Sequence, residues 1–306
     1  MRPVIQVSTI RKTYGSTLAV DDVSFEVRDG EIFGLIGPNG AGKTTTMECI
    51  EGLRTPDRGT ISVLGLDPLS DVYKLQERIG VQLQQAQLQK RIKVWEAVDL
   101  WASLYHRKAI DGERLLEQLG LIDKRNAWFM TLSGGQKQRL FIALALINDP
   151  ELVFLDELTT GLDPQARRAI WDLVRGIRER GKTVFLTTHL MEEAERLCDR
   201  VAIVDHGKVI TEGTPRELKQ RSADTTRVEV RLARPTANGS LKSLEGVVDA
   251  REVDGAYVLH CQRTAPAIVS LVKHLDSEQN ELVSLEIATP SLEDVFIELT
   301  GRRLRD

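Results

Sequence analysis

A phosphate-loop pattern runs from Gly37 to Thr45 and has the sequence Gly-Pro-Asn-Gly-Ala-Gly-Lys-Thr-Thr. In this pattern, glycines let successive backbone N–H groups surround a polyphosphate. Lys43 would add a positive charge near the β- and γ-phosphates, and Thr44 would offer its hydroxyl to Mg²⁺. The pattern predicts a nucleotide site, and its candidate ligands are Gly37, Asn39, Gly40, Gly42, Lys43, Thr44 and Thr45.

The segments on either side of the loop fit the same interpretation. Residues 32–36 predict a buried strand, and residues 45–51 predict a short helix that Gly52 ends. The N-terminus of such a helix would direct the positive end of its dipole at the phosphates. A strand followed by a helix favours a phosphate loop over a glycine-rich surface turn.

Two carboxylates follow another predicted strand. Residues 152–155 form a continuous apolar run, which is typical of a parallel strand buried on both faces. Asp156 and Glu157 come next, and acids at such a place are costly unless a cation or proton chemistry uses them. Asp156 is therefore a candidate Mg²⁺ ligand, and Glu157 is a candidate base for an attacking water. A solvated pair of acids is the simpler alternative, which the phosphate loop disfavours.

A helix and a further strand come after these acids. Asp163 and Pro164 begin the helix, since proline suits the first helical position, and Gly181 ends it. Residues 183–188 predict the strand, and His189 follows it. A strand, a helix and a strand form a βαβ unit, so the sheet should be largely parallel. Because ligands bind at the carboxyl ends of parallel strands, the phosphate loop, the acids and His189 can converge on one site.

The length and composition of the chain limit which class of protein it can be. The chain has 306 residues, of which 42% are apolar and 28% charged, enough for about two domains with ordinary cores. Its formal net charge of -4 argues against a nucleic-acid partner, which would favour a basic surface. Apolar runs are too short for a membrane span, and no signal peptide is visible. The three cysteines are widely spaced and predict neither disulfides nor a metal motif, so we expect a cytoplasmic protein.

The first part of the chain predicts mainly strands. Tyr14 lies between the first two of them, and taken alone it would be interpreted as a half-buried aromatic at a strand end. Residues 79–85 lead into a glutamine-rich loop. The expected strands are residues 4–7, 18–20, 23–27, 32–36 and 60–64.

The middle of the chain changes to a helical pattern near Val94, which predicts a helical insertion at about residues 86–148. Its last helix, at residues 136–147, follows Ser133, a residue suited to an N-cap, and Gly135 leaves its backbone N–H bare. This helix start is a second place able to hold an anion. Taken alone, it would be interpreted as a plain capped helix.

The remaining residues, 221–306, predict a second unit with a small α+β fold. A hairpin signal, Asp254-Gly255, separates two alternating segments. Ser291 caps a last helix with Asp294 three residues later. The expected apolar face of this helix consists of Leu292, Val295, Phe296 and Leu299. The other expected elements are strands at residues 226–232, 247–253, 257–261 and 282–287 and a helix at residues 266–275.

Taken together, these motifs resemble the ATP-binding cassette (ABC) ATPases over residues 1–220. Five separate motifs occur in the order of that family, and the signature at residues 133–136 (Ser-Gly-Gly-Gln) is the most specific. The resemblance implies an α/β P-loop NTPase core with a helical insertion, and ATP and Mg²⁺ as cofactors. The end of the chain, from Ser291 to Gly301, is similar to that of drug-exporter ATPases of the daunorubicin-resistance type.

The resemblance also implies roles for single residues. Tyr14 would stack on adenine, and Glu157 would act as the general base. Gln84, in the Gln-loop, would reach Mg²⁺ and the water. The residues expected to hold Mg²⁺ are Thr44, Gln84 and Asp156. The signature residues Ser133 and Gly135 would contact the γ-phosphate, and His189 would act as its switch. Gln136 and Asp163 are further expected nucleotide-binding residues, with Asp163 in the loop, residues 161–163, that crosses a dimer.

Two departures from the family pattern bear on these roles. The family usually has proline after the catalytic glutamate, whereas Leu158 stands there in this chain, and no catalytic group is lost. The Gln-loop lacks its usual proline, so Gln82, Gln84 and Gln85 compete for the role given to Gln84.

The resemblance implies the ATP-hydrolysing subunit of an exporter for drugs or lipophilic compounds. Two copies would pair head to tail and act through a separate transmembrane permease subunit at the cytoplasmic face of the membrane. One alternative is a soluble ABC protein acting on ribosomes or nucleic acid, which would have two cassettes or a basic surface. A second is an importer ATPase with a regulatory C-terminal domain, whose partner would have a solute-binding protein beside it. A third, a nucleotide-binding module without turnover, is disfavoured by Glu157.

Overall fold

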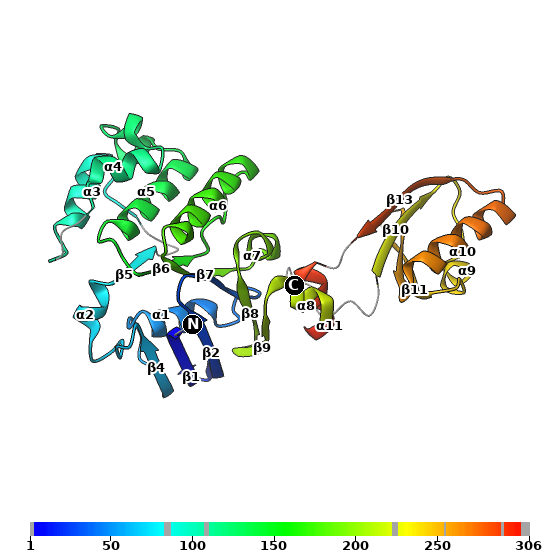
Figure 1. The fold of residues 1–306 in the computed structure, drawn as a ribbon, viewed down its shortest axis with the longest axis horizontal. Coiled ribbons are helices and arrows are strands. Elements are labelled where there is room, and N and C mark those ends of the chain that lie inside the picture. Colours follow the sequence, from blue (N-terminus) through cyan, green and yellow to red (C-terminus); the bar gives the residue numbers. More distant parts are fainter. Residues whose placement is uncertain are drawn as a thin grey trace. The chain divides into compact units, whose positions relative to one another are not determined.

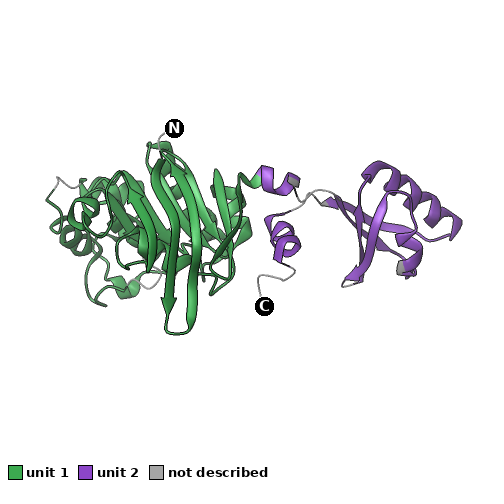
Figure 2. Ribbon diagram, turned by 90° about the horizontal axis from the view of Figure 1, so that it is seen from below, with its two compact units in different colours: residues 1–215, 304–306 green, residues 216–303 purple. Residues whose placement is uncertain are grey.

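The chain forms two compact units, which Figure 2 shows in different colours. The computed structural model describes residues 3–82, 87–106, 110–221, 226–253, 255–288 and 291–300. The first unit extends to Pro215 and the second begins at Arg216. Each contains a hydrophobic core of its own. Within the described ranges, no helix is both long and apolar enough to cross a bilayer.

A six-stranded sheet forms the centre of the first unit, in the order β5-β6-β7-β3-β8-β9 (Figure 1). Its neighbouring strands run parallel except for β9, which pairs antiparallel with β8 at one edge. The predicted α/β core with a largely parallel sheet is therefore confirmed. The strands are β3 (Ile32–Ile36), β5 (Ile79–Gln82), β6 (Leu152–Asp156), β7 (Thr183–Thr188), β8 (Arg200–Asp205) and β9 (Lys208–Gly213).

One face of this sheet packs against a smaller antiparallel sheet. Phe25 of the smaller sheet stacks on Phe33 of β3 and Phe185 of β7, with ring centroids 5.3 and 5.9 Å apart. Helix α1 (Lys43–Ile50) contacts strands of both sheets, so the helix that follows the phosphate loop is fixed between them. The smaller sheet has the order β2-β1-β4, with β1 (Pro3–Tyr14), β2 (Thr17–Arg28) and β4 (Arg58–Val63).

The other face of the parallel sheet carries α6 (Pro164–Glu179) and α7 (Met191–Leu197). Gly34 of β3 lets the chain after α7 approach closely, because a Cβ there would lie 2.6 Å from Sγ of Cys198. The sheet is thus covered on both faces, as expected for buried parallel strands.

A helical segment connects β5 to β6. Its helices are α3 (Val94–Ala102), α4 (Gly112–Gln118) and α5 (Gly134–Leu146), with 3₁₀ turns at Ile122–Lys124 and Phe129–Thr131. Helix α5 contacts α3 and α4 as well as β5 and α6, and it therefore ties the insertion to the core.

The second unit contains a four-stranded antiparallel sheet in the order β11-β12-β10-β13. Buried residues of α10, namely Ala267, Leu271 and Leu275, pack against its strands. The order β-α-β-β-α-β is that of a ferredoxin-like fold, and the predicted α+β class is confirmed. The elements are α8 (Pro215–Arg221), β10 (Thr226–Leu232), α9 (Asn238–Lys242), β11 (Val247–Val253), β12 (Ala256–Cys261), α10 (Thr264–Ser277), β13 (Leu282–Ala288) and α11 (Leu292–Thr300).

Some expectations about single elements were wrong. The strands predicted at residues 18–20 and 23–27 are one strand, β2, because Asp22 takes a positive φ of 53° and register shifts absorb the polar interruption. Leu299 is 49% exposed, since α11 buries Leu292, Val295 and Phe296 instead. The short helices α2 (Val72–Gln76), α7, α8 and α9 and the strands β8 and β9 were not predicted from the sequence.

Candidate active site

The phosphate loop connects β3 to α1, and two of its positions require glycine. Gly42 has a φ of 96°, and a Cβ there would lie 2.2 Å from the carbonyl oxygen of Ala19. A Cβ at Gly37 would lie 2.1 Å from the carbonyl oxygen of Val204. The loop therefore keeps its shape by close backbone contacts with β2 and β8.

Lys43 is the first residue of α1, and its ammonium is held against the loop. The side chain is buried, and Nζ donates hydrogen bonds to the carbonyl oxygens of Gly37 and Pro38, both at 2.9 Å. An ammonium has three donors, so one remains for a phosphate oxygen. Burial lowers the pKa of Lys43, whereas the charges of Glu157 and Asp156 raise it.

A cavity of about 420 Å³ lies over the loop. Tyr14, at the end of β1, lines it with a ring that is 39% exposed. The guanidinium of Arg54 and the ammonium of Lys12 lie 5.2 and 5.8 Å from the ring centroid. An exposed aromatic ring beside a phosphate site offers a surface for stacking a base. The cavity is lined by Tyr14, Ala19, Asn39, Gly40, Gly42, Lys43, Thr44, Thr45 and Glu157.

Asp156 is the last residue of β6 and is 4% exposed. Burial raises the pKa of Asp156, and repulsion from Glu157 adds to the rise. Hydrogen bonds from the hydroxyls of Thr187 and Thr44 and the charge of Lys43 oppose it. A buried carboxylate can be stabilised by pairing with a positive charge or by coordinating a metal ion, so Asp156 is a candidate metal ligand.

Glu157 follows directly and has a left-handed backbone, with a φ of 45°. Its N–H donates to the carbonyl oxygen of Thr187 at 3.1 Å, which joins the start of the loop to β7. Its Oε1 lies 3.2 Å from Nδ1 of His189. Leu158, in the place of the family's proline, is 2% exposed and does not restrict the backbone of Glu157 as proline would. The strand order β6-β7-β3 thus brings the acids, His189 and the phosphate loop to one edge.

The donors at this edge fit Mg²⁺. Asp156 offers a carboxylate and Thr44 a hydroxyl, and Mg²⁺ prefers such oxygens together with phosphate oxygens and water. Among the residues that the structure describes, no group of three or more His, Cys, Asp and Glu side chains could hold a metal by itself.

The signature residues lie outside this cavity. Ser133 caps α5 through a reciprocal pair of bonds with Gln136: its Oγ accepts from the Gln136 N–H at 3.3 Å, and its own N–H donates to Gln136 Oε1 at 2.9 Å. Asp163 caps α6 by accepting from two backbone N–H groups. None of these three residues, nor Gly135, lines the cavity over the phosphate loop. Gln84 lies outside the described residues.

Family models match two parts of the chain. The one described as ABC transporter matches residues 20–160, and the one described as ATP-binding protein DrrA1-3-like, C-terminal domain, matches residues 213–300. A protein of Ralstonia nicotianae named Nod factor export ATP-binding protein I is 38% identical over 312 residues, which cover 99% of this chain and 96% of that protein. The chain belongs to the ABC transporter family. It is an ATPase subunit of that family, and its second unit is of the DrrA type.

Solved structures of other ABC cassettes resemble the first unit. One titled as the ATP binding subunit of an ABC transporter has a TM-score of 0.64 and 30% identity, and covers 71% of this chain and 92% of its own. A second, titled as the dimeric structure of the bacterial ABC transporter cassette MJ0796, has a TM-score of 0.61 and 30% identity. It covers 69% of this chain and 98% of its own. The P-loop NTPase fold that the sequence implied is confirmed.

One residue near the site of this ABC ATPase was missed in the sequence. Glu193 of α7 is 1% exposed and accepts hydrogen bonds from the hydroxyl of Thr159 at 2.7 Å and the indole N–H of Trp171 at 3.0 Å. It thereby fixes the loop between Glu157 and Asp163 to α6 and α7. It stands between other acids in the sequence, so no local signal indicates its burial, which the two donors make possible.

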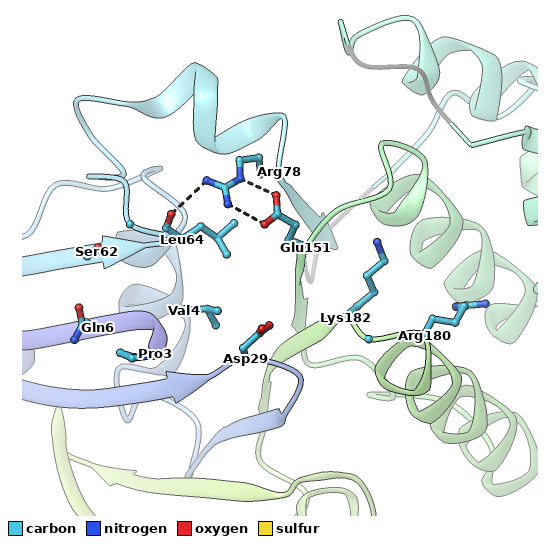
Figure 3. A pocket seen from close by; sticks show the side chains of 12 residues that line it. Pro3, Val4, Gln6, Asp29, Ser62, Leu64, Arg78, Glu151, Arg180 and Lys182 are labelled. Atoms are coloured by element: carbon cyan, nitrogen blue, oxygen red, sulfur yellow. Dashed lines mark hydrogen bonds and ion pairs between the residues drawn. The ribbon is translucent and has the colours of Figure 1, made fainter. Parts of the chain in front are cut away.

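A cavity of about 660 Å³ lies at the amino ends of the parallel strands, opposite the phosphate loop (Figure 3). Arg78 spans it with two bonds to Glu151, at 2.7 and 2.8 Å, and one to the carbonyl oxygen of Leu64 at 3.3 Å. Lys182 bonds Asp149 at 2.6 Å. The bonds of Arg78 connect the end of β4 to the starts of β5 and β6, and Lys182 with Asp149 connects the starts of β7 and β6, so we interpret these contacts as a structural link.

A groove of about 810 Å³ lies between the core and the helical insertion. Apolar side chains dominate its lining, and some are well exposed, such as Tyr73 at 84% and Leu104 at 65%. Glu51, just after α1, also lines it, although it is only 3% exposed. Its Oε1 has no hydrogen-bond partner among the described residues. Burial raises the pKa of Glu51 to about 8, with repulsion from Asp156 and Glu48 adding to the rise.

Because of this raised pKa, we expect Glu51 to make the free energy of unfolding depend on pH. The folded chain keeps the Glu51 proton up to about pH 8, whereas the unfolded chain releases it near the ordinary glutamate pKa of 4.5. The free energy of unfolding therefore falls as the pH rises between these values. Glutamine does not titrate. The free energy of unfolding of Glu51→Gln relative to that of the wild type should therefore rise from about pH 5.5 to about pH 8, by up to about 3 kcal/mol. Urea unfolding at both pH values measures this, with the exposed Glu192→Gln as control. An equal difference at both pH values would contradict the assignment.

Proposed function

We propose that this chain is the ATP-hydrolysing subunit of an exporter, and that two copies share their nucleotide sites head to tail beneath a separate membrane subunit. The observation that carries the proposal is the division of the motifs. The cavity over the phosphate loop contains the candidate base Glu157 but none of the signature residues. Ser133, which caps α5, lies outside the nucleotide cavity of its own chain.

Within one copy, the chemistry follows from the contacts at the strand ends. The glycine-rich loop and the third donor of Lys43 bind the β- and γ-phosphates. Asp156 and Thr44 would hold Mg²⁺, together with Gln84 as the resemblance implies, and the ion would neutralise phosphate charge. Tyr14 stacks on the adenine, next to the phosphate site.

Glu157 has the geometry of a general base. Its side chain is 8% exposed, and His189 holds one carboxylate oxygen at 3.2 Å. The other oxygen accepts a bond from the hydroxyl of Thr160 at 3.4 Å. A carboxylate fixed in this way takes a proton from a water aligned with the γ-phosphate. His189, which lies beside the same carboxylate, contacts the γ-phosphate directly.

The second copy completes the site. In a two-fold pair, Ser133, Gly135 and Gln136 of one copy lie against Lys43 of the other, and Asp163 lies near the two-fold axis. The start of α5 then brings backbone N–H groups and the positive end of its dipole to the γ-phosphate. The similar cassette MJ0796, which is titled as a dimer, supports an assembly of two copies.

Export, rather than import, is supported by the relatives and by the second unit. The Ralstonia protein named for Nod factor export aligns over 99% of this chain, and a DrrA-like C-terminal domain follows the cassette. We therefore propose a drug or another lipophilic compound as the substrate. The subunit would lie at the cytoplasmic face of the membrane and have no nucleic-acid partner.

We propose the groove beside Glu51 as the place where the membrane subunit binds. Its exposed apolar side chains suit the apolar face of a short helix, and the unpartnered oxygen of Glu51 suits a donor on that helix. A loop of the membrane subunit that carries such a helix would transmit the movement of α1 and the insertion to the pore.

Glu157→Gln tests the role of the base. The variant keeps the size and one hydrogen-bond acceptor of the side chain but cannot take a proton. We expect steady-state phosphate release to fall by about 10² or more, with ATP affinity unchanged, and ATP to convert the variant into dimers measured by light scattering. Glu192→Gln, an exposed acid on α7, is the control. Near-normal hydrolysis by Glu157→Gln would refute the assignment.

Leu104→Asp tests the groove. The charge would be unfavourable against an apolar partner surface, so the variant should lose copurification with its membrane subunit from detergent extracts by about tenfold. Its ATP affinity should be unchanged, because Leu104 does not line the phosphate cavity. Leu69→Asp, at a residue 42% exposed and outside the groove, is the matched control. Equal copurification of the two variants would place the membrane subunit elsewhere.

A further inference from the structure

The two edges of the sheet in the second unit differ in how they are protected. Edge strand β11 carries three charged residues, Asp249, Arg251 and Glu252. Charges of this kind keep other strands from pairing with an edge. The opposite edge strand, β13, has one charged residue, Glu286, and contains no lysine, arginine or proline. The pairing of each edge strand with its inner neighbour contains one register shift, at Val247–Asp249 in β11 and at Val283 in β13, so the charges are what distinguish the two edges.

Strand β13 is also apolar and exposed. Its sequence alternates apolar and polar residues around Leu285, which packs partly against the core. Val283 is 62% exposed and Ile287 is 50% exposed, and Ile287 lies on the same side of the strand as Leu285. The backbone on the outer side of β13 has no neighbouring strand among the described residues. An edge of this kind favours the addition of another strand.

We propose that β13 pairs antiparallel with β13 of a second copy, so that the two sheets join across a two-fold axis at Leu285. The proposal rests on the proposed function only in needing two copies that work together. It assigns the DrrA-like unit an interaction surface of its own, separate from the nucleotide site.

The sequence of β13 is complementary to itself in this register. Val283 of one copy lies opposite Ile287 of the other, and the reverse pair follows by symmetry. Ser284 lies opposite Glu286, where its hydroxyl can donate to the carboxylate. Leu285 lies opposite the second Leu285. Apolar residues therefore meet apolar residues, and no like charges face each other.

Other two-fold registers are poorer. A register centred on Glu286 would place two carboxylates directly opposite each other, which is destabilising. A register centred on Ser284 would pair a shorter part of the strand and leave Ile287 without an apolar partner. The register at Leu285 is the one that uses β13 from end to end.

Pairing between two copies also gives a closed assembly. A two-fold contact uses β13 of both copies and is then closed, while the protected edge β11 prevents further growth. A single pair of edge strands is weak alone, but the cassettes would hold the two copies together and raise the effective concentration of the second contact. The pairing would in turn stabilise the dimer.

Disulfide trapping in the full chain tests the register. Val283→Cys and Ile287→Cys are made as separate variants; the native Cys49, Cys198 and Cys261 are buried, and the wild type gives the background. In either variant alone, the two introduced positions lie about 14 Å apart across the axis and cannot form a disulfide. In a 1:1 mixture, position 283 faces position 287, so up to about half of the chains should become covalent dimers under mild oxidation.

A second pair of variants tests the contribution to assembly. Val283→Lys with Ile287→Lys should raise the dissociation constant of the ATP-bound Glu157→Gln dimer by about tenfold, because charges replace the apolar pairs. The matched control is Val248→Lys with Val253→Lys, at exposed positions of β11. It should change the dissociation constant of this dimer by less than about twofold.

The outcomes separate this inference from the proposed function. If ATP drives dimers but the cysteine mixture forms no more disulfide than either variant alone, the edge pairing is refuted and the shared nucleotide site stands. If the mixture forms disulfides but ATP drives no dimer, the pairing stands and the head-to-tail site is refuted. Equal effects of the β13 and β11 lysine pairs on dimerisation would also refute the pairing.

Discussion

The attraction between a buried lysine and two nearby carboxylates is the interaction on which the rest of the first unit depends. Lys43 follows the loop after β3, whereas Asp156 and Glu157 stand at the end of β6, and the charges of Lys43 and Asp156 would be costly to bury without opposite charges nearby. They meet because β6, β7 and β3 are adjacent and parallel. The order of strands, rather than the sequence of any one loop, creates the charge arrangement.

The surrounding packing keeps these groups in place. The stacked rings of Phe25, Phe33 and Phe185 join the two sheets below the phosphate loop. Close backbone contacts at Gly37 and Gly42 fix the loop itself, and Glu193 fixes the loop after Glu157. Ser133, at the start of α5, does not line the cavity over the phosphate loop. This separation is the basis of our proposal that a second copy completes the site.

The sequence predicted the parts of the site that depend on local rules. Glycine spacing, a strand before the loop and a helix after it were enough to locate Lys43 and Thr44. The apolar run before Asp156 predicted a buried strand, Ser133 was recognised as a cap and Asp163 as the start of a helix, and the structure confirms these local features. These features are encoded by neighbouring residues.

The features that were missed depend on contacts between distant residues. Glu51 and Glu193 are acids, and only the packing around them makes them buried. The polar pair Asp21-Asp22 predicted a break in β2, but pairing with β1 carries the strand through it. Leu299 fits the period of its helix and yet is exposed, because periodicity identifies a face without saying how far neighbouring elements cover it.

The shared nucleotide site is tested most directly by mixing two inactive variants. Lys43→Ala removes the phosphate contact, and Ser133→Asp keeps a good N-cap but places a negative charge against the γ-phosphate. Ser133→Asn, a neutral cap of the same shape, controls for folding. Each inactive variant alone should hydrolyse almost no ATP. In a 1:1 mixture, half of the dimers contain one site with an intact Lys43 and an intact Ser133, so the rate should recover to about a quarter of the wild type. A mixture no more active than its two components, under conditions in which the wild type hydrolyses ATP, would contradict the shared site.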